Sequence, residues 1–175
     1  DSEEDKLLSG FGFLSRKPML IVMNLSEGQT PPQIDYPHQH SMVTALQGKL
    51  EMDIAQLPAD EAEMFLAEYG IEEPSLNRMI RLSYELLGLL SFFTAGEDEC
   101  RAWTVHKGAN APEAAREIHT DLQKGFIRAE VVAYDDLMTL GSMHEAKTRG
   151  KLRVEGKEYI VKDGDVLNIL FNVKK

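Results

Sequence analysis

Asn24 and Glu27 stand in the turn that closes a short apolar run near the start of the chain. The run is Met19 to Met23, after a proline, and the turn reads Asn24-Leu25-Ser26-Glu27-Gly28. Five apolar residues without alternation, closed by turn formers, are typical of a strand buried on both faces. Ligands of open α/β sheets bind outside the carboxyl ends of the strands. An amide and a carboxylate at this position could therefore form a base-recognition loop, or only a polar turn that lets the chain leave the sheet.

His38 and His40 are the nearest approach to a metal-ligand pair in the sequence. Both lie in the proline-rich stretch "GQTPPQIDYPHQH", and no third ligand stands near them. A protein zinc site needs at least three such ligands, so we expect no metal here. The single cysteine, Cys100, has no CxxC partner, which indicates a packed or surface thiol and a reducing, cytoplasmic environment.

Two further groups of residues could contact RNA. Three aromatic residues could form a base-stacking platform, although core packing of a small sheet is the alternative that we favour: Trp103, Phe126 and Tyr134. Four basic residues gather in "HEAKTRGKLR", where they form either a solvated rim or an RNA and ribosome contact: Lys147, Arg149, Lys151 and Arg153.

Length and charge limit the classes of protein that the chain can belong to. Its 175 residues, 43% of them apolar, suffice for one sizeable domain or two small ones. Residues 1–90 carry 6 Lys and Arg against 15 Asp and Glu, whereas residues 91–175 carry 13 against 14. The acidic first half would repel a nucleic-acid backbone, so we expect no DNA partner. No apolar run approaches the roughly 20 residues of a membrane span, and no signal peptide opens the chain, so we expect a cytoplasmic protein without a membrane partner.

The order of elements expected in the first half is typical of an α/β layer. A strand over 18–23, a long loop and a second strand, "SMVTAL", precede two helices. The first helix starts at Pro58 and stops at Gly70. The second, over 73–90, carries an apolar stripe at helical spacing that we interpret as core: Leu76, Met79, Ile80, Ser83, Leu86, Leu87 and Leu90.

After residue 91 the order of elements predicts a β-grasp, an α+β module. A strand, "CRAWTVHKG", leads to a helix, "APEAAREIHTDLQK", whose start has a capping-box spacing between Asn110 and Glu113 and which stops at Gly125. A strand, "FIRAEVVAY", and an irregular helix, "DDLMTLGSMHEAKTR", follow. A hairpin around Glu155-Gly156 and a turn at Asp163-Gly164 then lead to the last strand, so that a sheet over about 95–173 should wrap on the helix after Asn110.

Several stretches resemble YchF, the Obg-like ATPase family of P-loop proteins. They are "KPMLIVMNLSE", "YELLGLLSFFTAGEDECRAWTVHKG", "IHTDLQKGFIRAEVVAYDDL" and "GKEYIVKDGDVLNILFNV". The resemblance implies an α/β partial P-loop NTPase domain over 1–90, with the end of its helical insertion. It implies a ubiquitin-like TGS domain, of the β-grasp type, over 91–175.

The resemblance also assigns roles to residues. "NLSE" occupies the place of the NKxD motif of ordinary GTPases, and "QGKLE" the place of the SAK-like loop, where Gln47 stands instead of Ser or Cys. The implied nucleotide-binding residues are Asn24, Leu25, Glu27, Gln47 and Gly48. The implied protein is a ribosome-associated triphosphatase that binds ATP or GTP with Mg²⁺ in its full-length form.

The departures from the family pattern are as informative. No GxxxxGK[ST] motif occurs, so no residue of this chain inherits a catalytic role, and we expect neither activity nor a bound cofactor from these residues alone. The chain opens with Asp1 inside an acidic run, which suggests a piece of a longer protein. The alternative function is a non-enzymatic β-grasp binding adaptor.

Glu27 and Leu25 bear on base selectivity. In NKxD proteins a short Asp accepts two hydrogen bonds from guanine, whereas Glu27 is one methylene longer and Leu25 replaces the Lys. We expect Asn24 to pair with a purine N7 and its exocyclic group, and the Leu25 N–H and C=O to meet the adenine edge. ATP should therefore bind at least as tightly as GTP.

Overall fold

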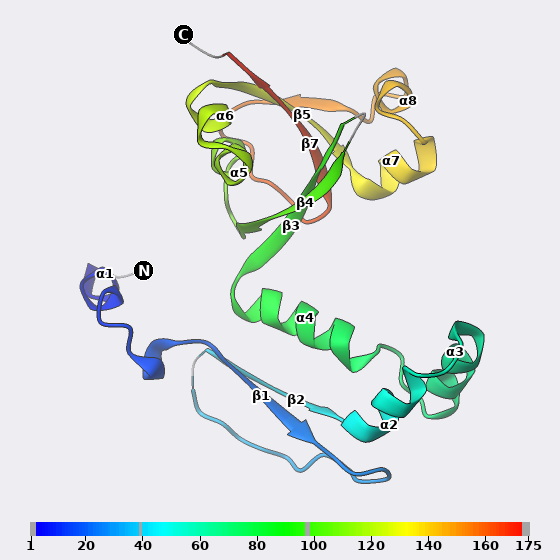
Figure 1. The fold of residues 1–175 in the computed structure, drawn as a ribbon. Coiled ribbons are helices and arrows are strands. Elements are labelled where there is room, and N and C mark those ends of the chain that lie inside the picture. The colour runs from blue at the N-terminus through cyan, green and yellow to red at the C-terminus, as the bar shows by residue number, and fades with distance from the viewer. Residues whose placement is uncertain (1–2, 39, 97–98, 173–175) are drawn as a thin grey trace. The chain divides into compact units, whose positions relative to one another are not determined.

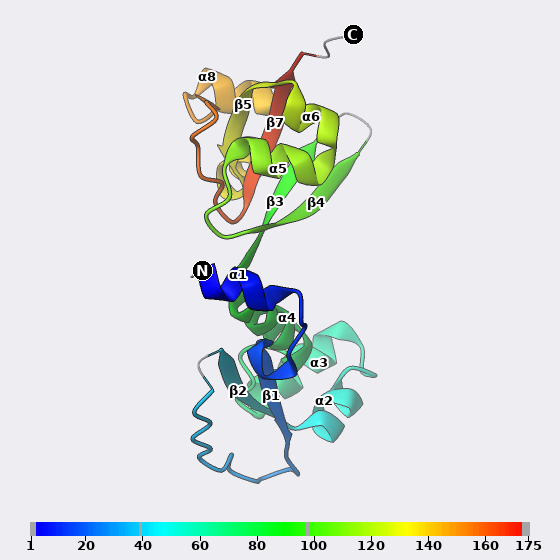
Figure 2. The ribbon, with the colours of Figure 1, turned by 90° about the vertical axis from the view of Figure 1, so that its left-hand side faces the viewer.

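The computed structural model describes residues 3–38, 40–96 and 99–172. The chain divides into two compact units, Asp1–Leu87 and Gly88–Lys175, drawn in Figures 1 and 2. The expected boundary at residues 90 and 91 falls inside a strand, since Gly88, with φ 63°, ends the preceding helix earlier than predicted. Asp1, Gln39 and Val173, which the predicted elements included, lie outside the described residues.

Unit 1 combines a pair of strands with short helices. In chain order it contains α1 (Glu3–Ser9), the 3-10 turn η1 (Leu14–Arg16), β1 (Met19–Asn24), β2 (Ser41–Leu46), α2 (Gly48–Ile54), α3 (Ala59–Glu68) and α4 (Ser75–Leu86). β1 and β2 are parallel and pair from Met19 with Ser41 to Asn24 with Leu46. α4 packs against both strands, as Figure 1 shows.

The expectation that the first strand is buried on both faces is wrong for this structure. Leu20 to Met23 are half-buried, and Met19 and Val43, which share one face of the strand pair, are each 37% exposed. Two strands with one helix packed on them leave part of the apolar surface uncovered. The apolar run therefore predicts the strand correctly but not its burial.

The apolar stripe of the second predicted helix is not a continuous core face. Met79, Ser83 and Leu86 are half-buried, whereas Leu76 and Ile80 are 69% and 51% exposed. α4 stops at Leu86, and Leu90 lies in the following strand, where it is 7% exposed.

Unit 2 contains a five-stranded mixed sheet with helices on both faces. Its elements are β3 (Leu89–Ala95), β4 (Cys100–His106), α5 (Ala111–Ile118), α6 (Thr120–Lys124), β5 (Phe126–Ala133), α7 (Tyr134–Leu140), α8 (Met143–Thr148), β6 (Arg153–Glu155) and β7 (Asp165–Phe171). The strand order is β4-β3-β7-β5-β6, in which only the pair β3 and β7 is parallel.

The main core lies between the sheet and α5, which crosses it in Figure 2. Ala111, Ala114 and Ala115 of α5 are fully buried against Phe92, Leu167 and their neighbours. Alanines on the packed face let the helix approach the sheet closely, and large strand side chains fill the layer. A second cluster, around Val132, Ala146 and Val166, packs on the opposite face under α7 and α8.

Three predicted elements of this unit differ from the structure. The long helix is divided at His119, whose extended backbone (φ −165°) separates α5 from α6. The irregular helix is divided at Gly141, with φ 77°, into α7 and α8. The predicted hairpin around Glu155 is wrong: β6 pairs with β5 instead, and after a turn the chain makes an isolated bridge between Ile160 and Asn110.

Candidate nucleotide-binding site

The two predicted base loops lie at the same edge of unit 1, because β1 and β2 are parallel and end side by side. Asn24, the last residue of β1, is in register with Leu46, the last residue of β2. The Leu25 N–H donates to the Leu46 carbonyl at 2.8 Å and so extends the pairing one residue beyond the strands. The NLSE loop therefore starts beside the loop made of Gln47 and Gly48.

Asn24 joins the two loops directly. Its side-chain Oδ1 accepts a hydrogen bond from the Gly48 N–H at 3.1 Å. A side chain at position 48 would bring its Cβ to 3.0 Å from Asn24 Oδ1 and to 3.0 Å from a Leu46 methyl group. Such a contact is tighter than almost all real Cβ contacts, so the close approach of the two loops favours glycine.

Glu27 points toward the end of α3. Its carboxylate accepts a hydrogen bond from the Tyr69 hydroxyl at 3.5 Å, at the long limit of such bonds. The turn itself is closed by Ser26, whose N–H donates to Gln29 Oε1 at 2.9 Å and whose carbonyl accepts from the Gln29 N–H at 3.1 Å. Gly28, with φ 74°, supplies the left-handed residue of the turn.

A hollow of about 510 Å³ lies beside the NLSE loop and is called the base hollow below. Its lining residues are Asn24, Leu25, Ser26, Glu27, Lys49, Leu50 and Asp53. Three of the predicted site residues thus lie together, and Gly48 joins them through its bond to Asn24. Lys49 and Asp53, which the sequence analysis did not select, also line this hollow; both lie in or just after "QGKLE", on α2.

Two observations bear on the contacts expected of Leu25 and Gln47. The Leu25 N–H already donates to Leu46, so in this arrangement only the Leu25 carbonyl can meet a base edge. Gln47 lines a second hollow, of about 460 Å³, on the side of Tyr69 and Arg78, together with Leu25. Its Oε1 is buried without a hydrogen-bond partner in the described part of the chain, as is Arg78 Nε. Gln47 therefore does not line the base hollow.

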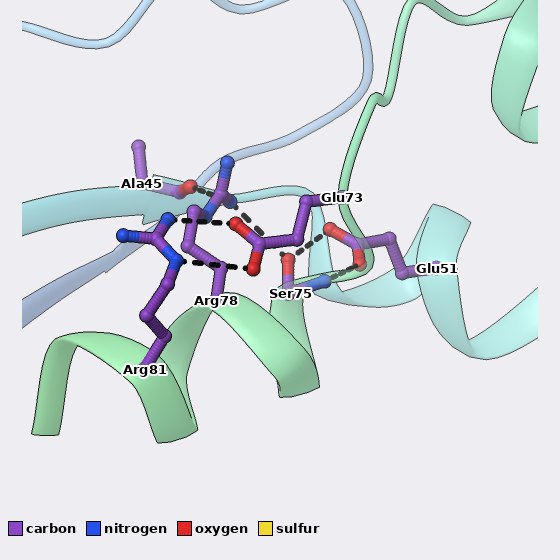
Figure 3. A network of polar contacts seen from close by, with 6 residues as sticks. All are labelled: Ala45, Glu51, Glu73, Ser75, Arg78 and Arg81. Atoms are coloured by element: carbon purple, nitrogen blue, oxygen red, sulfur yellow. Dashed lines mark hydrogen bonds and ion pairs between the residues drawn. The ribbon is translucent and has the colours of Figure 1, made fainter. Parts of the chain in front are cut away.

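A polar network joins α4 to α2 and β2, as Figure 3 shows, and two of its members, Glu51 and Arg78, line the second hollow. Glu51 Oε2 accepts from the Ser75 N–H at 2.6 Å, and its other oxygen accepts from the Ser75 hydroxyl. Arg78 Nη2 donates to the Ala45 carbonyl at 2.6 Å and to Ser75 Oγ at 3.4 Å. Sequence reasoning missed Ser75 and Arg78, because nothing in their spacing signals a contact with a loop some 30 residues earlier.

One exposed ion pair in the same view lies beside these contacts, and its Glu73 carboxylate lines the second hollow with Glu51 and Arg78. Arg81 donates to both oxygens of Glu73, at 3.2 and 2.7 Å. This hydrogen bond is the main cause that lowers the pKa of Glu73 and raises the pKa of Arg81.

The predicted basic cluster of unit 2 consists largely of side chains that hold acidic partners. Lys151 pairs with Asp136 at 3.0 Å, and Arg149 lies 3.9 Å from Glu145. Arg153 pairs with Glu155 at 3.3 Å. For Lys147 no ion pair occurs within the described residues. The four side chains are exposed and follow one another from α8 to β6, but their charges are partly compensated.

Arg153 also belongs to a partly buried network. It donates to the Tyr159 hydroxyl at 3.1 Å, and Tyr159 donates to Asp165 Oδ2 at 2.7 Å. Asp165, 3% exposed, also accepts from the Lys162 N–H at 2.9 Å. Burial, and then the bond to Asp165, raise the pKa of Tyr159 to about 12, and the bond to Tyr159 raises the pKa of Arg153. These hydrogen bonds stabilise the turn from Lys162 to Asp165.

The remaining candidate residues do not come together as sites. His38 Nε2 lies 2.6 Å from the Ser15 carbonyl, and its Nδ1 accepts from the His40 N–H at 3.4 Å. Within residues 3–38, 40–96 and 99–172, no three His, Cys, Asp or Glu side chains are grouped to hold a metal. Cys100 is exposed.

The three aromatic residues do not form a common platform. Phe126 is 6% exposed and belongs to the main core, on which Trp103 also packs. Trp103 donates to Thr94 Oγ1 at 2.9 Å and lies under the Arg101 guanidinium. Tyr134 lies against Phe93, next to the second cluster.

No helix within the described residues is long and apolar enough to cross a lipid bilayer.

The two units give the chain a mixed α/β fold, with two loops in contact at the edge of a parallel strand pair. A family model named YchF-GTPase_C, described as a protein of unknown function (DUF933), matches residues 89–172. The chain is 46% identical over 98% of its length to the ribosome-binding ATPase YchF of Bacillus subtilis (strain 168), and 45% identical over 98% to that of Escherichia coli O157:H7. It covers 50% and 49% of these proteins.

A solved structure gives the same result. The YchF GTPase of Schizosaccharomyces pombe matches 74% of this chain and 34% of its own, with a TM-score of 0.65 and 32% identity. The chain belongs to the YchF family and spans about half the length of the curated relatives it matches.

Proposed function

We propose that this chain supplies the base-reading edge and a TGS domain of a cytoplasmic, ribosome-associated nucleoside triphosphatase. In the full-length protein it would bind ATP, with Mg²⁺, at least as tightly as GTP. The residues present here would bind and orient the base, and the phosphate-binding and hydrolytic groups would come from the P-loop half of the full-length protein.

The observation that carries the proposal is the hydrogen bond between Asn24 Oδ1 and the Gly48 N–H, at 3.1 Å. It uses one lone pair of the amide oxygen and orients the whole carboxamide at the mouth of the base hollow. The amide NH₂ can then donate to a purine N7. The second lone pair of Oδ1 can accept from the exocyclic N6–H of adenine, whereas guanine presents an acceptor, O6, at that position.

Glu27 supports the preference for adenine. A carboxylate one methylene longer than Asp either collides with guanine or turns away, and here it is directed to the Tyr69 hydroxyl. Without a carboxylate against N1–H and N2–H, guanine would lose about 2–4 kcal/mol of selectivity. The turn therefore favours adenine, which has no N1–H or N2–H to donate to a carboxylate.

The architecture of unit 2 supports the TGS part of the proposal. Its sheet has the strand order that a β-grasp requires, β4-β3-β7-β5-β6. The two central strands, β3 and β7, are the first and last strands of the unit along the chain; they are parallel, and the helix α5 packs across the sheet. The relatives are named ribosome-binding ATPases, and the exposed basic cluster is the surface of unit 2 that we assign to such a contact.

Competition titrations of the full-length protein with ATP and GTP test the proposal. The unmodified protein should bind ATP at least as tightly, Asn24→Ala should weaken both nucleotides, and the pair of changes Leu25→Lys and Glu27→Asp should shift preference toward GTP. Strong preference for GTP in the unmodified protein would contradict the assignment and leave the NLSE turn as a turn only.

A further inference from the structure

The first turn of α4 contacts the chain on both sides of the Gln47–Gly48 loop. Before the loop, the Ala45 carbonyl accepts from Arg78 at 2.6 Å. After the loop, the Glu51 carboxylate accepts from the N–H and the hydroxyl of Ser75. A segment of five residues is thus held at its two ends by one helical turn, as Figure 3 shows.

The contacts before and after the loop form one connected network. Arg78 Nη2 also donates to Ser75 Oγ at 3.4 Å, which joins the contact before the loop to the contact after it. Ser75 is 7% exposed, so the carboxylate of Glu51 acts in a partly desolvated setting where charge-assisted hydrogen bonds are strong.

Glu51 also completes the helix. The N-cap residue of α4 is Pro74, which makes no side-chain cap, so the Ser75 N–H depends on the Glu51 carboxylate from α2. A negative charge at this end is also favoured by the helix dipole. The start of α4 and the position of the loop are therefore coupled through the same side chain.

We propose that Glu51, Ser75 and Arg78 are positioning residues for base recognition. They hold the Gln47–Gly48 loop at the place where the Gly48 N–H meets Asn24 Oδ1 and so orient the carboxamide that reads the base. None of the three lines the base hollow, so they act through Gly48 and Asn24 and not by touching the nucleotide. The inference rests on the proposed function, because it presumes that Asn24 binds the base.

The Glu73–Arg81 ion pair provides a matched control. Arg81 lies one turn after Arg78 on the same helix and makes a bidentate ion pair with Glu73. Neither of these two bonds reaches either end of the loop. Changing Arg81→Met removes a guanidinium from α4, as Arg78→Met does, but none of the bonds that it breaks reaches Ala45, Glu51 or Ser75.

The experiment compares two ligands on the full-length protein, ATP and tripolyphosphate, both with Mg²⁺. Tripolyphosphate has no base, so its affinity is independent of the base loops. Arg78→Met and Glu51→Gln should each weaken ATP binding by up to about tenfold and leave tripolyphosphate binding unchanged, because a misoriented amide loses about one hydrogen bond to the base. Arg78→Lys, which retains a donor for the Ala45 carbonyl, should restore most of the ATP affinity, and Arg81→Met should change neither ligand.

Thermal unfolding of each variant shows whether it is folded. If Arg78→Met does not fold, the comparison of the two ligands is made with Glu51→Gln. ATP affinity equal to that of the unmodified protein in folded Arg78→Met and Glu51→Gln would overturn the inference, as would an equal loss for ATP and tripolyphosphate. Asn24→Ala separates the two levels: if it binds ATP normally, the proposed base site is wrong, whereas a loss in Asn24→Ala without one in Arg78→Met rejects only the positioning role.

Discussion

At the scale of single residues, the proposed base site depends on one close approach, that of Asn24 to Gly48. The amide oxygen and the backbone N–H are 3.1 Å apart, and a Cβ at position 48 would require Asn24 or Leu46 to shift by a few tenths of an ångström. The family resemblance predicts a binding role for both residues, and the structure places them in contact. The resemblance could not identify that the Leu25 N–H is already bonded to Leu46, because hydrogen bonds between strands depend on a pairing that the sequence does not specify.

Gly48→Ala tests this close approach. The added methyl group should push the loop from Asn24 and weaken ATP binding of the full-length protein about fivefold, which corresponds to ~1 kcal/mol and the net value of one hydrogen bond. Calorimetric titration measures it. Gly156→Ala is the control, because a Cβ there meets nothing within 4 Å. An unchanged affinity in Gly48→Ala would show that the amide tolerates the displacement.

The raised pKa of Tyr159 predicts a late step in the alkaline titration of the chain. Its pKa is raised to about 12, first by burial and then by the bond to Asp165, so folding favours the neutral phenol. The stability that follows from this shift is fully present below about pH 10, the ordinary tyrosine value, and is lost as the pH rises toward 12. Ultraviolet absorbance of the phenolate should show a step near pH 12 that is absent in Tyr159→Phe. A titration without that step would contradict the burial and bonding of the hydroxyl.

At the scale of elements, sequence patterns predict where most helices and strands begin, and they fail where two elements share one composition. β3 starts only two residues after α4, beyond Leu87 and Gly88, and Leu90 continues the helical stripe, so the predicted helix runs into β3. The Glu155-Gly156 turn suggested a hairpin, but β6 takes β5 as its partner. Local signals cannot choose between a near and a distant partner, and for the same reason the contact of Ser75 and Arg78 with the loop could not be foreseen.

The start of α5 is the element boundary that local signals predict best. The Asn110 Oδ1 accepts from the Glu113 N–H at 3.0 Å, and Glu113 accepts from the Asn110 N–H at 2.8 Å, a complete capping box. Asn110→Ala should lower the free energy of unfolding of unit 2 by about 1 kcal/mol, because the helix carries three fully buried alanines and loses its cap. Chemical denaturation measures the loss. Asn110→Asp, which keeps the acceptor, should cost little; an equal loss in both variants would assign the effect to something other than the cap.

At the scale of the whole molecule, charge separates the two halves of the chain. The first half is strongly acidic and the second nearly neutral, and the exposed basic cluster between α8 and β6 is the edge that we assign to the ribosome. Its pairing with acidic neighbours implies that contact with a phosphate must compete with ion pairs at 3.0 to 3.9 Å.

Reversal of the basic cluster should weaken ribosome association of the full-length protein and flatten its salt dependence. The salt slope should fall by about 0.7–0.9 for each phosphate that the protein no longer neutralises. The residues changed to Glu are Lys147, Arg149, Lys151 and Arg153. Co-sedimentation with ribosomes across a salt series provides the measurement. A control set of exposed basic residues of unit 2, changed in the same way, is Lys107, Arg116, Lys124 and Lys157. An equal or larger loss of association in the control set would place the ribosome-binding surface elsewhere.

The parallel pairing of β3 with β7 has a consequence for the time course of synthesis. The centre of the sheet of unit 2 joins the strand that the ribosome makes first to the strand that it makes last, with Phe93 beside Val166. Until β7 has left the exit tunnel, Phe92 and its neighbours have no Leu167 or Ile169 to pack against. The unit therefore completes its fold late, by closing a contact across nearly its full length, which is the slow kind of closure. A nascent chain that stalls before Asp165 would remain open, with its apolar strands available to chaperones.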